Sequence, residues 1–574
     1  MNSPIPNYLR PLVLVGILAL PLMGCLANSV ESSEKSSMAL INGQIYTVNN
    51  SQLVAEAVVM EGDEIVFVGA SDKAQAYIFD ETQVIDLNGK MVLPGIHDTH
   101  LHPLEAGLYE VKCILESEQS VSIWTSELTQ CAAQNGGSDW LLGWGHNINT
   151  LLQGSRSPKN LLDVIDSERP IAIMEATSHS VWVNSKALQL AGISESSQNP
   201  QGGAILKGLD GHPNGVLLDA AGDLIFDLAF APTPARMESN YQGLLYGLGQ
   251  VAKNGITSIS DARVYWRRNY LQVWQRVLQE KQLTARTVLG LWAYPDMDDA
   301  QQIAQLKSMY SNDQGSLLRV SQIKLYSDGI THNATAALLS PYQDYFEEVG
   351  ALGLNYFNKE RLALYAEELQ GVGFNMHIHA IGDRGVRESL DAIEYAQVQN
   401  ALSQNSEEPR HRITHVEMVS EQDVERFFEL GVIADFQLAG DFTKPEYFYE
   451  MEPLIGQRAH EMLPVKDIYQ TGATITLSSD WDVSSLSPFV GMQNALTRSE
   501  QSLPNLDAVI RAYTINGAFS LDQEKITGSI EVGKKADMII IDQNLLEIPV
   551  SKISETQVLK TIFAGEIIYD GSDQ

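Results

Sequence analysis

The chain has 574 residues, more than one ordinary domain, so we expect either two domains or one large barrel with additions. Its hydrophobic content of 44% is typical of a globular protein. The 38 basic residues stand against 72 acidic ones, and the resulting formal net charge of -34 repels phosphate backbones, so the composition argues against nucleic-acid binding.

The N-terminus has the features of a secretory signal. Residues 1–24 contain one arginine, an apolar run of about a dozen residues and a small-residue end. Residues 22–25, LMGC, resemble the bacterial lipobox, which implies that Cys25 is lipidated and that residues 25–38 form a tether. No aspartate follows Cys25, so the resemblance favours export and anchoring in the outer membrane, facing the periplasm or the exterior; a soluble periplasmic protein is the alternative.

Two cysteines remain if Cys25 is acylated, because the chain has 3 in all. In an oxidising periplasm Cys113 and Cys131 could pair. Two buried free thiols are the other interpretation, and the sequence leaves both open.

Short strands with Gly-Asp and Asn-Gly turns are concentrated at both ends of the mature chain. Residues 39–92 contain ALINGQIYTV and TQVIDLNGKMVLPG, and a similar pattern returns in residues 522–574 with KKADMIIIDQN and VLKTIFAGEIIYDG. We therefore expect a small β-sandwich domain assembled from both ends of the chain.

The middle, residues 93–521, alternates short apolar runs with helical patterns such as KERLALYAEELQGVG. Eight such strands indicate a (β/α)8 barrel, with a doubly wound open sheet as the alternative. The connection between the first two strands is too long for a loop, so residues 103–250 should form an inserted subdomain. The predicted strands are 95–102, 256–262, 286–293, 322–329, 374–382, 412–418, 431–437 and 473–480.

Potential metal ligands occupy the ends of five predicted strands. In an extended strand, positions i and i+2 point the same way, so the two histidines of HDTHLH project side by side; a pair of ordinary surface histidines is the alternative. Reactive groups of a barrel lie at the C-terminal ends of its strands, and imidazoles with a carboxylate suit one or two divalent ions, typically zinc. The candidates are His100 and His102, Lys324, His379, His415 and Asp480.

These motifs together resemble the amidohydrolase superfamily, and ALINGQIYTV, LPGIHDTHLHP, HAIGD, WVNSKAL and SSDW are similar to its YtcJ-like branch, which includes N-substituted formamide deformylase. The resemblance covers the chain from about residue 38 onwards. It implies that His100 and His102 hold one metal, that His379 and His415 hold a second, that a carboxylated Lys324 bridges them, and that Asp480 binds the metal-bound water as general base.

Several assignments keep alternatives. Lys324 could be an unmodified, salt-bridged barrel lysine, and His377 could replace His379 as a ligand. We expect His97 to be a buried polar residue and Asp98 to orient a ligand imidazole. The predicted substrate-binding residues are Trp144, His146, His179 and Trp481, each with ordinary packing as its alternative.

The implied function is a metal-dependent hydrolase that cleaves a carbon–nitrogen bond other than a peptide bond, in a linear or N-substituted amide, by a metal-activated hydroxide. A ring deaminase or an ester or lactone hydrolase of the same superfamily is the enzymatic alternative. A surface lipoprotein used as a binding module is the non-enzymatic one. We expect a small-molecule substrate and contact with the membrane only through the lipid, and a homodimer is a possible assembly.

Overall fold

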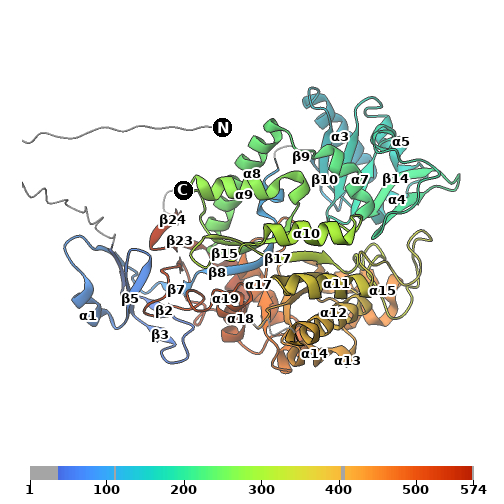
Figure 1. Ribbon diagram of the computed structural model, residues 1–574. Helices are drawn as coiled ribbons and strands as arrows, with labels where there is room; N and C mark the ends of the chain where they lie inside the picture. The colour runs from blue at the N-terminus through green and yellow to red at the C-terminus, as the bar shows by residue number, and fades with distance from the viewer. Residues whose placement is uncertain (1–36, 109–110, 403–407, 572–574) are drawn as a thin grey trace, which may run out of the picture. The chain divides into compact units, whose positions relative to one another are not determined.

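The computed structural model describes residues 37–108, 111–402 and 408–571 (Figure 1). The predicted signal peptide, Cys25 and nearly all of the tether lie outside these ranges. Among the described helices, none has both the length and the apolar character of a membrane span.

Eight parallel strands form the central sheet, and each neighbour in the sheet is also the next barrel strand along the chain. Backbone hydrogen bonds beyond the last strand close the ring: Asp480 N–H donates to His100 O at 2.8 Å, and His102 N–H donates to Trp481 O at 2.6 Å. The predicted (β/α)8 barrel is therefore confirmed, and the open sheet is wrong. The strands are β8 (Ile96–Leu101), β15 (Ile256–Val264), β16 (Arg286–Trp292), β17 (Leu318–Tyr326), β18 (Asn375–Ala380), β19 (Arg412–His415), β20 (Ile433–Phe436) and β21 (Ile475–Leu477).

The helices between the barrel strands begin where the sequence supplies caps. Asp298 accepts the backbone N–H of Gln301 at the start of α10 (Asp299–Met309), and Asn358 accepts that of Arg361 at the start of α11 (Lys359–Gln370). Figure 1 shows α10, α11 and α12 (Asp383–Leu402) following one another beside the strands that they connect. Further helices of the barrel are α8 (Pro234–Lys253), α9 (Tyr270–Gln279), α16 (Val465–Gln470), α17 (Pro488–Thr497), α18 (Leu506–Tyr513) and α19 (Ile515–Ser520).

Two sheets pack face to face in the small β-domain. One is four-stranded, in the order β5-β4-β1-β6, and the other is six-stranded, in the order β24-β23-β22-β7-β2-β3. The two ends of the chain meet in the second sheet, where β22 pairs antiparallel with β7. Buried side chains of both sheets share one core, which confirms the predicted sandwich. The strands are β1 (Ser37–Ile41), β2 (Gln44–Tyr46), β3 (Val54–Ala55), β4 (Ala57–Glu61), β5 (Glu64–Gly69), β6 (Gln83–Asp86), β7 (Met91–Pro94), β22 (Met538–Ile541), β23 (Val558–Phe563) and β24 (Glu566–Asp570).

The predicted insertion after the first barrel strand is a subdomain built on a six-stranded sheet in the order β13-β14-β12-β11-β10-β9. Its strands are β9 (Val111–Ile114), β10 (Leu141–His146), β11 (Ile171–Glu175), β12 (Ser180–Val183), β13 (Gly203–Lys207) and β14 (Pro213–Asp219). Its longer helices are α3 (Val121–Gln134) and α7 (Ala220–Ala229).

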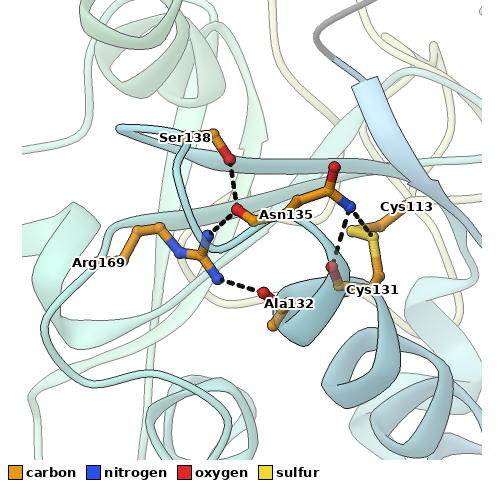
Figure 2. Close-up of a disulfide and its surroundings, with 6 residues drawn as sticks. All are labelled: Cys113, Cys131, Ala132, Asn135, Ser138 and Arg169. Carbon is orange, nitrogen blue, oxygen red and sulfur yellow. Dashed lines mark hydrogen bonds between the residues drawn. A yellow bond between two sulfur atoms is a disulfide. The ribbon is translucent and has the colours of Figure 1, made fainter.

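A disulfide between Cys113 and Cys131 joins edge strand β9 to α3, so of the two interpretations that the sequence left open, pairing is the one found (Figure 2). At the end of the same helix, the guanidinium of Arg169 donates to the carbonyl oxygens of Ala132 and Asn135. Because the last carbonyls of a helix lack partners within it, Arg169 satisfies two groups that the helix leaves open.

Candidate metal centre

The two histidines of the HDTHLH motif lie where the strand pattern predicts. His100 is in β8 and His102 directly follows it, both are 1% exposed, and their ring centroids are 5.2 Å apart. Asp480 follows β21, the last barrel strand, and its Oδ1 lies 3.3 Å from His100 Nε2 and 3.1 Å from His102 Nε2. These three side chains form one of the groups whose donor atoms are close enough to hold a metal ion.

Three more predicted ligands surround this group. The ring of His415 lies 5.0 Å from that of His100 and 4.5 Å from that of His379, and its Nδ1 is 4.0 Å from Asp480 Oδ2. Lys324 extends from β17 and is completely buried. The structure thus brings all six sequence-predicted ligands to the C-terminal ends of the barrel strands, where a barrel carries its reactive groups.

Unpartnered atoms test whether this cluster suits a metal. Among the described residues, Lys324 Nζ and His379 Nδ1 are buried and have no hydrogen-bond partner, whereas His102 Nδ1 lies 3.9 Å from Glu105 Oε2. Buried polar groups normally have hydrogen-bond partners, so buried nitrogens without one are available to bind a ligand such as a metal ion. The other nitrogen of His379 lies 3.1 Å from Gly329 O, which would fix the ring with Nδ1 free to bind. The donor set therefore fits a divalent ion of the zinc type.

Burial sets the protonation of the cluster. It lowers the pKa of Lys324 well below the ordinary value, which disfavours the ammonium form, and lowers the pKa of His415 to about 3, so this imidazole is neutral near pH 7. Burial alone would raise the pKa of Asp480, but its electrostatic interaction with His100 and its hydrogen bonds with His100 and His102 hold it well below its usual range. Neutral nitrogens beside an ionised carboxylate are the protonation states that metal ligation requires.

Sequence reasoning missed a layer of polar residues behind His100. His377 Nε2 and Thr414 Oγ1 each lie 2.9 Å from His100 Nδ1, and Arg412 donates to His377 Nδ1 at 2.8 Å. His377 thus contacts a predicted ligand, although His100, His377 and Asp435 also form a second group with metal-binding spacing. A polar residue inside a buried strand, such as Asp435 in IADF, is the signal that could have indicated this layer.

Asp98 and His97, the other polar residues at the start of the HDTHLH motif, form no hydrogen bond with the rings of the candidate ligands among the described residues. Asp98 accepts the backbone N–H groups of His100 and Ser479, so it joins the first and last strands instead of orienting an imidazole as we expected. His97 is buried and contacts Gly95 O and Thr527 Oγ1, as predicted for a buried polar residue.

The four predicted substrate-binding residues differ in where they lie. The ring of His179 is 5.2 Å from that of His379, and Trp481 adjoins Asp480 and accepts the N–H of His102. Trp144 and His146 lie in β10 of the inserted sheet, and neither has a hydrogen bond, ion pair or ring contact with the six candidate ligands in the described part of the chain. Their predicted role stays a prediction.

Residues 83–569 match the Amidohydrolase family. Putative amidohydrolase YtcJ of Bacillus subtilis (strain 168) is 26% identical over 92% of this chain and 99% of its own length. N-substituted formamide deformylase of Arthrobacter pascens is 24% identical over 94% and 99%. An uncharacterized metal-dependent hydrolase from Pyrococcus horikoshii OT3 shares the fold, with a TM-score of 0.71, 23% identity, and coverage of 90% of this chain and 99% of that one. The curated relatives support the YtcJ-like branch that the motifs indicated, and the chain belongs to the Amidohydrolase family.

Proposed function

We propose that this protein is a metal-dependent hydrolase that cleaves the carbon–nitrogen bond of a linear or N-substituted amide. One observation carries the proposal: four imidazoles, a buried lysine and an ionised carboxylate converge at the mouth of the barrel, and Lys324 Nζ and His379 Nδ1 have no hydrogen-bond partner among the described residues. A protein that only binds a ligand would not need both a full set of metal-ligating side chains and an ionised carboxylate beside them. Family membership supports a hydrolase, and the deformylase among the relatives supports an amide substrate.

His100 and His102 would hold one zinc ion, and His379 and His415 would hold a second. When bound, such ions polarise the carbonyl under attack and lower the pKa of water toward neutrality. Asp480 lies within hydrogen-bond distance of both His100 and His102, so its carboxylate is placed to take the proton from the attacking water and deliver it to the leaving nitrogen.

Lys324 is suited to carboxylation because burial disfavours the charged ammonium form of its amine. Only an unprotonated amine attacks carbon dioxide, and the reaction gives a carbamate and releases one proton. Burial keeps the pKa of Lys324 low, and Nζ has no hydrogen-bond partner among the described residues. A carbamate would place two oxygen donors between the two metal positions, which a bare amine does not provide.

We also propose that the protein acts outside the cytoplasm, lipid-anchored to the outer membrane through Cys25, on a small-molecule substrate. The disulfide between Cys113 and Cys131 supports export, because disulfides persist in oxidising compartments. Labelling with a fatty-acid analogue tests the anchor: wild type should carry the label, and Cys25→Ser should not.

Metal content tests the proposed centre directly. The chain without residues 1–24 is compared with its Lys324→Ala and Lys324→Met variants by elemental analysis after zinc loading. We expect about two zinc ions per chain in wild type, falling to one or none in both variants, because loss of the bridge removes shared ligands. The exposed Lys359→Ala is the matched control and should bind as much zinc as wild type.

The outcomes separate the alternatives. One zinc in wild type and variants would remove the bridging lysine and favour mononuclear chemistry. No zinc in wild type under replete conditions would contradict the metal centre itself. Hydrolysis of a panel of N-substituted formamides by the zinc-loaded wild type, lost in Asp480→Asn, tests the amide substrate and the proposed base.

A further inference from the structure

A hairpin of the inserted subdomain delivers a histidine to the barrel cluster. Strands β11 and β12 are antiparallel neighbours, and the turn between them contains Ser178 at a φ of 63° followed by His179. His179 is 7% exposed, and its carbonyl accepts the backbone N–H of Asp219 at 2.8 Å. The ring is stacked over Tyr326 at 5.7 Å and lies 5.2 Å from the ring of His379.

A carboxylate fixes one nitrogen of this ring. His179 Nδ1 lies 2.7 Å from Asp219 Oδ1, and the hydroxyl of Tyr356, in the loop after β17, donates to the same oxygen at 3.1 Å. The Asp219 side chain is completely buried, and its backbone has a φ of 51°, a conformation that non-glycine residues adopt only when the surroundings impose it. The pair therefore ties the inserted subdomain to the barrel with a defined geometry.

The hydrogen-bond partner of His179 Nδ1 determines whether Nε2 acts as a hydrogen-bond donor or acceptor. A carboxylate only accepts hydrogen bonds, so the Nδ1 that contacts Asp219 carries a proton, and the ring then offers Nε2 as its acceptor atom. Within the described ranges, Nε2 of His179 forms no hydrogen bond. The ring of His179 lies 5.2 Å from that of His379, so this acceptor belongs to a ring that adjoins the candidate metal centre.

We propose that His179 is a catalytic residue whose Nε2 accepts a hydrogen bond from the N–H of the substrate amide, with Asp219 and Tyr356 as positioning residues. The inference rests on the proposed amide hydrolysis and narrows its substrate class to amides that keep an N–H. An N,N-disubstituted amide lacks the donor and leaves this acceptor without its partner in the reacting complex, which costs binding.

The test compares one N-substituted formamide that carries an N–H with its N,N-disubstituted counterpart. Zinc-loaded wild type, His179→Phe, Asp219→Asn and the exposed His212→Gln of the same subdomain are assayed for kcat and KM on both, and their zinc content is measured. Phenylalanine keeps the ring over Tyr326 but has no acceptor. His179→Leu, which also lacks an acceptor, serves if the phenylalanine variant does not fold.

We expect His179→Phe to lower kcat/KM for the N–H formamide about tenfold or more, with the N,N-disubstituted formamide changed less than about twofold and zinc content unchanged. Asp219→Asn should reduce the same preference, because an amide no longer enforces the proton on Nδ1. His212→Gln should keep the wild-type preference.

Three results would overturn the inference. An unchanged preference in His179→Phe would show that the ring does not contact the N–H. Loss of zinc in that variant would identify His179 as a metal ligand instead. If wild type hydrolyses neither formamide, the proposed function fails as well, whereas hydrolysis with an unaltered preference in the variant contradicts this inference alone.

Discussion

Strained backbone marks two of the candidate ligands. His415 has a φ of 74° and Asp480 a φ of 54°, and left-handed conformations cost non-glycine residues about 1–3 kcal/mol. Each lies just past or at the end of a barrel strand, where the chain turns away from the sheet. The hydrogen bond from Asp480 N–H to His100 O helps to impose this conformation. The strain is thus located where side chains must converge on the cluster.

Burial of a histidine outside the cluster makes folding depend on pH. His411 is 1% exposed, its Nδ1 accepts the N–H of Met376, and its Nε2 lies 2.9 Å from Gln370 Oε1, so both nitrogens are satisfied in the neutral ring. Burial lowers the pKa of His411 to about 3. Between pH 6.5 and pH 3, His411 is protonated in the unfolded chain but stays neutral in the folded protein. The contribution of His411 to stability is therefore fully present above pH 6.5 and is lost as the pH falls toward 3.

We therefore expect His411→Gln to flatten the pH dependence of the unfolding free energy by about 2 kcal/mol between pH 7 and pH 5. Denaturant unfolding at several pH values measures the slope, which separates this effect from any general loss of stability. His212→Gln, at an exposed position, should leave the slope unchanged. The same slope in His411→Gln and wild type would show that His411 titrates normally in the folded protein.

At the level of elements, the edge of the inserted sheet depends on a covalent link. Within the described residues, strand β9 has a neighbour, β10, on one side only, and the disulfide of Cys113 and Cys131 ties it to α3. The bridge closes a loop with a sequence separation of 18 residues. Closing a loop of this size in the unfolded chain stabilises the fold by about 3 kcal/mol in the chain-entropy model.

Replacing both cysteines, Cys113→Ala with Cys131→Ala, should lower the unfolding free energy by about 3 kcal/mol. Denaturant unfolding with and without reductant provides the measurement and its control, because reductant should destabilise wild type and leave the double variant unaffected. Equal stability of the oxidised wild type and the double variant would mean that the bridge is not needed to hold β9.

At the level of the whole molecule, a buried ion pair joins the β-domain to the barrel. Arg286 of β16 donates to both carboxylate oxygens of Asp537, at 2.7 and 3.3 Å, and the Asp537 side chain is 1% exposed. The backbone N–H of Ala564, between β23 and β24, donates to the same carboxylate at 2.8 Å. The carboxylate of Asp537 therefore binds both a barrel strand and the C-terminal part of the β-domain.

Removing that charge leaves Arg286 buried without its partner, so Asp537→Asn should destabilise the protein by about 3 kcal/mol or more. The exposed pair Lys552–Glu555 offers the control: Glu555→Gln should cost less than about 1 kcal/mol. Urea unfolding of wild type, Asp537→Asn and Glu555→Gln measures the two losses of unfolding free energy. Similar losses in both variants would indicate that the buried pair contributes no more than a surface pair.

The sequence predicted most of the barrel but overextended some of its strands. Strand β17 begins at Leu318 and ends at Tyr326, whereas the apolar pattern indicated 322–329, and β21 covers only Ile475–Leu477 of the predicted 473–480. Buried polar residues within the strand, such as Arg319 and Gln322, interrupt the apolar run without ending the strand. Conversely, the ligand-bearing tails lie beyond the hydrogen-bonded ladder, because they turn toward the cluster.

The sequence by itself determined the alternation of strands and helices, the family and the six candidate ligands, since these depend on local periodicity and on short motifs. Only the tertiary structure decided which partners those residues have. The contacts of His100 with His377 and Thr414, and of His179 with Asp219 and Tyr356, join residues far apart in the chain. Such pairings follow from barrel closure and from the docking of the inserted sheet, and no local pattern encodes either of them.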